Sequence, residues 1–375
     1  MNWVWARPSS KGCSPTALCD EPDTAPFYAL PLFNTTPFMK STPYPIVSHP
    51  SAWVSADYAN HTDKWIKTLP DAARREIEAA AAGLPRGSLQ AITSAQIDNA
   101  NLNAARTYMA GIEEEVMQGR GFVLLRGLSV ELDDWMLRAC YWVIVNLLGR
   151  LISQNSYGDR LCDVTDTGAE AGGRRVRGYQ TSARLRFHTD RCDLVGLLCL
   201  RPAMAGGLSS IASAVTAYNK LAERDPDMLA PLLRGVNYLN LEEGGDSTVT
   251  RLPVFSFQGD TLSVRYSRNS YDTAMRHGAE FTEIEMSALA AIDQLAEDPA
   301  LRLEMDLQRG DIQLINNYTT LHSRTSFQDW PQEDRKRCMT RAWVHTHLRR
   351  PVGTHFADYD GVPVTLSREK SPVTP

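Results

Sequence analysis

Apolar residues in the first part of the chain recur with helical spacing, and each such segment is followed directly by a glycine. A glycine at this position is a common helix terminator. The segments that predict helices are 71–82, 103–118 and 133–148. Residues 121–127 instead form a short apolar run between two glycines, which predicts a strand. We therefore expect a helical outer layer over about residues 70–150.

From residue 151 onward the pattern changes to short runs typical of strands. Strands are predicted over 161–164, 194–200, 209–212, 236–239, 262–266, 311–316 and 337–345. Two helices are expected between them, over 213–223 and 282–296, and the second opens with a capping box of Thr282 and Glu285. This density of short strands is typical of a jelly roll or double-stranded β-helix.

The expected fold is mainly β with flanking helices around a cupin-like jelly-roll core. We expect one domain over 51–375, with the barrel at about 151–347 and a C-terminal tail over 348–375. Residues 1–50 hold nine of the 21 prolines and predict an extended arm. Disorder is the alternative, but the arm is rich in aromatic residues. It could pack over an active-site mouth or against a neighbouring subunit of a homo-oligomer.

Composition narrows the functional classes. The 375 residues are 43% hydrophobic, enough for a large core, and the net charge of −5 provides no basic surface for nucleic acid. Seven scattered cysteines without a C-x-x-C pair indicate reduced thiols. The chain lacks an apolar signal region and a stretch as long as a membrane span. We therefore expect a cytoplasmic protein that binds neither nucleic acid nor membrane.

The candidate chemistry begins with His188 and Asp190. On an extended segment these side chains share one face, with Cα atoms roughly 6.6 Å apart, close enough to bind one metal ion. Alone the pattern is weak, since about one chain in two or three would carry it by chance. A second histidine, His322, follows the predicted strand 311–316 after a short loop. Two histidines and one carboxylate form the facial triad of non-haem Fe(II) oxygenases.

The predicted strand 337–345 adds a cationic face. Arg337 and Arg341 point to the same side of it, together with Trp343, which we interpret as a packing residue. Two arginines that face a barrel interior are costly unless each meets an anion. A dicarboxylate co-substrate is the expected partner.

Taken together, these segments resemble the TauD/TfdA (taurine dioxygenase-like) family of Fe(II)/2-oxoglutarate-dependent oxygenases, which includes clavaminate synthase-like enzymes. The resemblance extends from about residue 119 to about residue 347. The motifs that carry it are Phe187-His188-Thr189-Asp190, Gly206-Gly207-x-Ser209, Gly310-Asp311, Leu321-His322-Ser323-Arg324-Thr325 and Arg337-x-x-x-Arg341.

The resemblance implies a cofactor set and a ligand set. His188, Asp190 and His322 would hold Fe(II), with 2-oxoglutarate and O2 at the open positions. The two co-substrates would supply the oxidising power, with release of succinate and CO2. Halogenases similar to this family lack the carboxylate ligand, so Asp190 indicates an oxygenase.

The resemblance also assigns binding residues. Arg337 would clamp the distal carboxylate of 2-oxoglutarate, with the Ser209 hydroxyl in the place of the family's usual threonine. Arg341 would bind an anionic group of the substrate. Three further polar residues lie where the family's substrate loop begins: Gln154, Asn155 and Tyr157.

The predicted function is oxidation of an unactivated C–H bond in a small anionic molecule, such as an amino acid or another carboxylate. Hydroxylation, desaturation and oxidative ring closure all begin with the same hydrogen abstraction, so the ligand residues do not separate them. One alternative is a catalytically silent cupin-like binding or sensing module, which would have no need of a 2-oxoglutarate clamp. A hydrolytic zinc enzyme is another, but no separate general base is evident.

Overall fold

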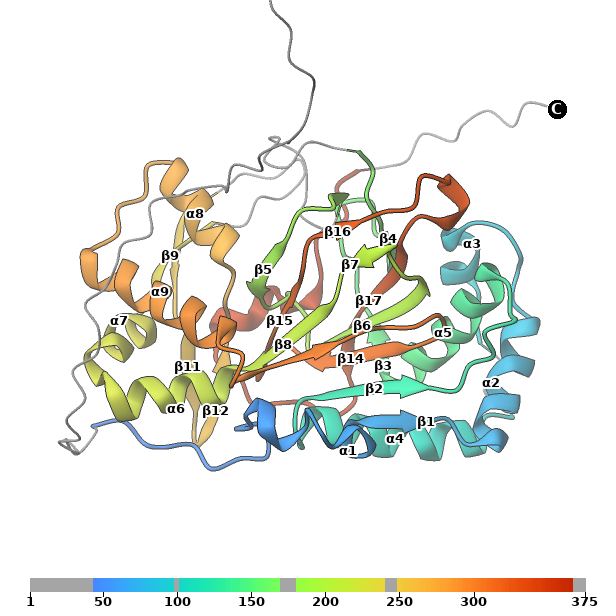
Figure 1. Ribbon diagram of the computed structural model, residues 1–375, viewed down its shortest axis with the longest axis horizontal. Coiled ribbons are helices and arrows are strands. Elements are labelled where there is room, and N and C mark those ends of the chain that lie inside the picture. The colour runs from blue at the N-terminus through green and yellow to red at the C-terminus, as the bar shows by residue number, and fades with distance from the viewer. Residues whose placement is uncertain (1–42, 98–100, 169–179, 240–247, 367–375) are drawn as a thin grey trace, which may run out of the picture. The chain divides into compact units, whose positions relative to one another are not determined.

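A computed structural model describes residues 43–97, 101–168, 180–239, 248–366 of the chain (Figure 1). Most of the predicted N-terminal arm, the cysteines at positions 13 and 19 and the end of the predicted tail lie outside the described residues. Within the part that is described, no helix is long and apolar enough to cross a membrane. The division into arm, barrel and tail stays a prediction.

The larger sheet has seven strands. In spatial order they are β1 (Ile66–Thr68), β2 (Phe122–Arg126), β14 (Ile312–Asn316), β6 (Leu194–Arg201), β17 (Cys338–Thr346) and β3 (Gly149–Leu151), with β4 (Leu161–Val164) also paired to β17. All neighbours are antiparallel except β1 and β2. The two faces of this sheet enter different cores. On β14, Ile312 and Leu314 pack against the outer helices, whereas Ile315 points to the interior.

The smaller sheet runs β13 (Arg302–Met305), β8 (Ser209–Ser213), β15 (Thr320–Arg324) and β5 (Leu185–His188). Both sheets contribute to one inner core, with Phe122, Val195 and Trp343 from the larger and Ile211 and Met305 from the smaller. Three separate two-stranded sheets are also described: β7 (Ala205–Gly206) with β16 (Phe327–Gln328), β9 (Val236–Tyr238) with β10 (Thr250–Leu252), and β11 (Phe255–Gln258) with β12 (Thr261–Val264). The expected jelly roll with flanking helices is confirmed.

Helices cover the outside of both sheets (Figure 1). Three of them, α2 (Asp71–Ala82), α4 (Asn103–Met117) and α5 (Asp134–Leu148), pack on the larger sheet. Three others, α6 (Ala214–Arg224), α7 (Leu229–Arg234) and α9 (Glu283–Glu297), pack on the smaller-sheet side. The described short helices are α1 (Thr62–Trp65), α3 (Leu89–Ser94), α8 (Arg268–Arg276), η1 (Ser55–Asp57), η3 (Pro226–Met228), η4 (Glu333–Arg335) and η5 (Thr354–Asp360).

Local signals account for the helix ends. Asp133 caps α5, its Oδ1 accepting the Met136 N–H at 2.7 Å, and the expected capping box of Thr282 and Glu285 is present at α9. Gly149 stands where α5 passes directly into β3. It has φ +153°, and a side chain there would collide with the His345 carbonyl, so the junction requires glycine. The five helices predicted from the sequence agree within one residue at each end.

Strand prediction was less complete. β12 begins and ends earlier than the predicted strand 262–266. The strands that were not predicted are β1, β3, β5, β7, β10, β11, β13, β15 and β16. His322 therefore lies within a strand of its own, β15, which follows the turn after β14.

Candidate active site

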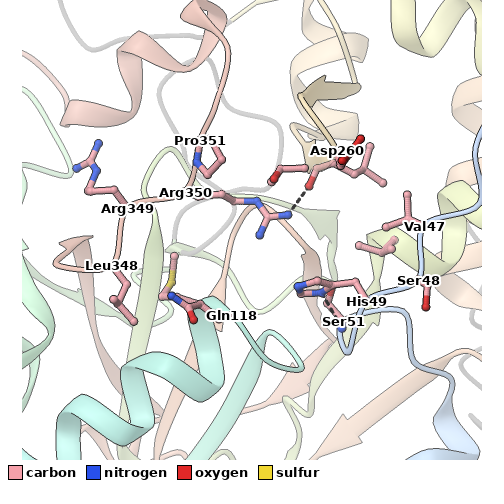
Figure 2. A pocket seen from close by; sticks show the side chains of 14 residues that line it. Val47, Ser48, His49, Ser51, Gln118, Asp260, Leu348, Arg349, Arg350 and Pro351 are labelled. Atoms are coloured by element: carbon pink, nitrogen blue, oxygen red, sulfur yellow. Dashed lines mark hydrogen bonds between the residues drawn. The ribbon is translucent and has the colours of Figure 1, made fainter.

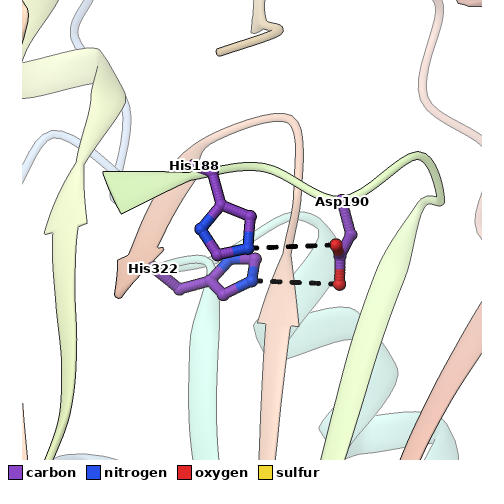
Figure 3. A group of neighbouring side chains, drawn as sticks. All are labelled: His188, Asp190 and His322. Atoms are coloured by element: carbon purple, nitrogen blue, oxygen red, sulfur yellow. Dashed lines mark ion pairs between the residues drawn. The ribbon is translucent and has the colours of Figure 1, made fainter. Parts of the chain in front are cut away.

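Three potential metal ligands converge where β5, an edge strand of the smaller sheet, pairs with β15 (Figure 3). His188 ends β5 and is paired in register with His322 on the neighbouring strand β15, while Asp190 follows β5 by two residues. The two histidine Nε2 atoms lie 4.0 Å and 3.9 Å from the carboxylate oxygens of Asp190. All three ligand atoms lie within 4.8 Å of one another, so one ion can bridge them.

The protonation states suit metal binding. Burial lowers the pKa of His188, and burial together with His188 lowers the pKa of His322 to about 3. Burial alone would raise the pKa of Asp190, but Arg341, both histidines and the indole N–H of Trp343 bring it down to about 2. Neutral imidazoles beside an ionised carboxylate are the forms that bind a divalent cation. Two nitrogen donors and one oxygen donor match the facial triad of non-haem Fe(II) proteins.

The tautomer of His188 follows from its hydrogen bond. Its Nδ1 lies 2.9 Å from the carbonyl oxygen of Arg186, and a carbonyl can only accept. Nδ1 therefore carries the hydrogen, and the lone pair of Nε2 faces the centre of the triad.

Neighbouring residues hold Asp190 in place. Its backbone N–H donates to Asn317 Oδ1 at 2.9 Å, and its Oδ2 accepts the Trp343 Nε1–H at 2.9 Å. Trp343 belongs to the inner core as predicted, but it also orients a candidate metal ligand, which the sequence interpretation missed. The sequence signal for this orienting role was the position of Trp343, two residues from Arg341 on the same face of one strand. Asn317, in the turn before β15, had no comparable signal.

The C-terminal segment contacts the loop that carries Asp190. Asp358 in η5 forms ion pairs with Arg265 and, at 3.6 Å, with Arg191, the residue after Asp190. Phe356 and Tyr359 of η5 are buried. This part of the predicted tail is thus packed against the barrel.

Arg341 is held beside the triad. Its Nη1 lies 3.5 Å from Asp190 Oδ2, and its Nε donates to Gln154 Oε1 at 2.7 Å. The Gln154 amide in turn donates to the carbonyl oxygens of Arg341 and Arg160, each at 2.9 Å. Of the three polar residues predicted to bind substrate, Gln154 therefore contacts the site indirectly, through its hydrogen bonds with Arg341.

The other two belong to the adjoining turn. Asn155 donates to Asp159 Oδ2 at 2.9 Å and accepts from the backbone N–H of Tyr157, whose side chain is exposed. A substrate-binding role for Asn155 and Tyr157 stays a prediction.

A second cluster holds two buried cations. Arg337 and Arg324 are 2% and 6% exposed, and both guanidinium groups contact the Phe327 ring, at 5.2 Å and 4.7 Å from its centre. Within the described chain neither has a carboxylate at ion-pair distance, and Nε and Nη1 of Arg337 and Nε of Arg324 lack a hydrogen-bond partner. Burial, with Arg337 adding to it, lowers the pKa of Arg324 to about 10, and burial lowers the pKa of Arg337. Two buried cations without a counter-ion are a strong physical indication of an anion site.

Small residues surround this pair. Gly207 has φ +71°, and a side chain there would press on Arg337 Nε at 3.1 Å. Ser209 lies opposite Arg324 in the strand register, and its hydroxyl donates to Gln313 Oε1 at 2.9 Å. From the sequence, Arg324 is, with Arg341, an alternative to Arg337 as the 2-oxoglutarate anchor, and its place two residues beyond His322 on one strand puts both on the same face.

The jelly roll, the triad and the buried arginine pair define the class of a non-haem iron oxygenase. The sequence matches the model of the taurine catabolism dioxygenase TauD, TfdA family over residues 86–343. The chain belongs to this family and is a non-haem iron, 2-oxoglutarate-dependent dioxygenase.

Two curated relatives illustrate the spread of the family. FR-33289 synthase of Streptomyces rubellomurinus is 30% identical over 319 residues, which cover 82% of this chain and 93% of that protein. Uridine-5'-phosphate dioxygenase of an Amycolatopsis species is 30% identical over 179 residues, covering 45% and 63%.

Solved structures share the fold. An asparagine oxygenase in complex with Fe(II), 2S,3S-3-hydroxyasparagine and succinate has a TM-score of 0.57 and 19% identity, covering 75% of this chain and 94% of its own. The non-haem iron oxygenase OrfP in complex with Fe and alpha-ketoglutaric acid has a TM-score of 0.53 and 15% identity, covering 75% and 93%.

Proposed function

We propose that this dioxygenase oxidises an unactivated C–H bond of a small anionic molecule, with His188, Asp190 and His322 as the iron ligands. The convergence of these three side chains, with both imidazoles neutral, is the observation that carries the proposal. When bound, iron, 2-oxoglutarate and O2 supply the oxidising power, and succinate and CO2 are released. The residues around the centre orient the ligands and exclude water.

The co-substrate pocket is proposed at the arginine pair. Arg337 is the main anchor for the distal carboxylate of 2-oxoglutarate, since two of its guanidinium nitrogens are buried without partners. Arg324 adds a second positive charge against the same Phe327 ring, while its Nη2 donates to the Thr181 carbonyl at 2.8 Å. Ser209, opposite Arg324 in the register of β8 and β15, is proposed to add its hydroxyl to this site. Such a pair favours a dicarboxylate over a neutral ligand and argues against a silent binding module.

The substrate is proposed to carry an anionic group that approaches Arg341. The guanidinium of Arg341 lies against the triad and is aligned by Gln154, which suits recognition of a charged group near the reacting carbon. Relatives whose names specify uridine-5'-phosphate and asparagine act on small polar molecules, which is consistent with this proposal. Hydroxylation, desaturation and ring closure remain alternative outcomes of the same hydrogen abstraction.

Succinate formation tests the proposal. Purified protein with Fe(II), 2-oxoglutarate and O2 is presented with a panel of amino acids, other carboxylates, phosphate esters and sulfonates. We expect one group of acids to raise succinate release above the uncoupled background. His322→Ala should abolish this release and lower iron occupancy. Full activity of His322→Ala would refute the ligand assignment, and release that continues with zinc in place of iron would refute the redox chemistry.

A cytoplasmic location is part of the proposal. It is supported by four described cysteines that are buried and form no disulfide: Cys140, Cys192, Cys199 and Cys338. Free thiols are expected in a reducing compartment. Association into a homo-oligomer stays a prediction, to be tested by size-exclusion chromatography with light scattering.

A further inference from the structure

A separate cleft of about 250 Å³ shares no residue with the triad or the arginine pair (Figure 2). Five chain segments form it: residues 47–51, the end of α4, the first turn of α6, the β11–β12 turn and the segment that follows β17. At about 30 Å³ per water molecule, the volume suits a small ion with a few waters rather than a nucleotide.

Arg350 supplies the central charge of the cleft. Its guanidinium is fixed at one edge, where Nε donates to Ser263 Oγ at 3.1 Å and Nη2 donates to the Leu262 carbonyl at 2.5 Å. No carboxylate of the described residues lies at ion-pair distance from it. Burial lowers the pKa of Arg350 to about 10, with only the Tyr318 phenol opposing. Arg350 is therefore a fixed, partly buried cation that lacks a counter-ion among the described residues, and an incoming anion would stabilise it.

His49 adds a hydrogen-bond donor beside this cation. Its Nδ1 lies 3.1 Å from the backbone nitrogen of Ser51, which can only donate, and 2.7 Å from the Ser51 hydroxyl. Nδ1 is therefore an acceptor, so the neutral ring carries its hydrogen on Nε2. Burial and then the charge of Arg350 lower the pKa of His49, and both side chains line the cleft. Figure 2 shows the His49 ring and the Arg350 guanidinium on the same cavity.

The remaining charged groups of the lining leave an excess of positive charge. Arg349 at the rim is half exposed, and its Nη1 lies 3.6 Å from Asp193 Oδ2. Asp260, the one acidic residue among those that line the cleft, is exposed on the β11–β12 turn. Gln118 and Ser48 contribute polar groups without charge.

We propose that this cleft binds a small oxyanion, held by the Arg350 guanidinium and the Nε2–H of His49, with Arg349 at the entrance. Inorganic phosphate and a short carboxylate present the same chemistry, namely oxygen atoms that accept from a guanidinium and an imidazole. This site is independent of the proposed co-substrate pocket, since none of the residues at Arg337 lines it.

Binding is measured on the full-length protein by calorimetry and by thermal unfolding, with inorganic phosphate and succinate in separate titrations. Ionic strength is held constant with sodium chloride, so that general screening does not contribute. We expect saturable binding, and a tenfold or greater loss of affinity in Arg350→Gln. A larger affinity for phosphate or for succinate identifies which oxyanion the site prefers.

Three variants separate this site from its alternatives. Arg337→Gln should leave the proposed binding intact, because it removes the other anion site. Arg86→Gln, at an arginine whose side chain is 71% exposed, controls for loss of one surface charge. His49→Ala, in a partly exposed segment, should weaken binding several-fold and tests the site if Arg350→Gln does not fold.

The proposal is overturned if the wild-type protein shows no saturable binding, if binding is lost in Arg337→Gln, or if His49→Ala and a folded Arg350→Gln both bind like the wild type.

Discussion

The hydrogen bond from Trp343 to Asp190 should tune metal affinity, and Trp343→Phe removes it while keeping an aromatic ring in the inner core. The bond is 2.9 Å long, buried, and directed to an ionised carboxylate. A hydrogen bond to a charged group contributes about 1.5–3 kcal/mol. If that energy is expressed fully in metal binding, it corresponds to roughly 10- to 150-fold in the dissociation constant. Loss of an outer hydrogen bond at metal sites costs about 10- to 100-fold, so both estimates agree.

Anaerobic titration of Fe(II) by calorimetry measures the effect. Trp53→Phe is the matched control, since Trp53 belongs to the same inner core and its Nε1 donates at 2.9 Å to the Arg120 carbonyl rather than to a candidate ligand. Both variants should lose some stability against thermal unfolding, but only Trp343→Phe should lose iron affinity. An unchanged iron dissociation constant in Trp343→Phe, with a stability loss like that of Trp53→Phe, would show that the indole only packs.

Three further predictions follow from the arginines and one helix cap. Arg337→Lys keeps the charge but loses the planar fork, so the KM for 2-oxoglutarate should rise well above that for the substrate. If this KM is unchanged in Arg337→Lys but rises in Arg324→Gln, Arg324 is the main anchor. Arg341→Ala should weaken substrate affinity roughly ten- to a hundred-fold with 2-oxoglutarate binding nearly unchanged, and the methyl ester of the substrate should react poorly; equal turnover of acid and ester would instead assign Arg341 to the internal contact with Asp190. Asp133→Ala removes the cap of α5 and should lower the free energy of unfolding by about 1 kcal/mol without changing either KM, as measured by urea denaturation.

Much of the candidate site was accessible from local sequence because its parts lie close together along the chain. His188 and Asp190 are two residues apart on one extended segment, and Arg337 and Arg341 are four apart around one strand. Helix boundaries were equally local, since a capping residue such as Thr282 and a terminating glycine such as Gly149 act within one turn.

The two strands that carry the histidine ligands, β5 and β15, escaped prediction for a physical reason. β15 places His322 and Arg324 toward the interior, so its inward positions are polar and the usual alternation of apolar and polar residues is absent. β5 likewise carries Arg186 and His188 in its four residues. A short strand whose inward positions are polar does not carry the alternation by which strands are found.

The sequence by itself determined the class of fold, the helices, the two halves of the motif and the type of chemistry, because these depend on periodicity and on residue types at short spacing. Only the tertiary structure decided which distant groups meet. His322 reaches His188 through the register of β15 and β5, Gln154 aligns Arg341 from 187 residues away, and Asn317 and Trp343 fix Asp190. Register between short strands is set by packing on both faces of a sheet, and not by any one strand's own residues.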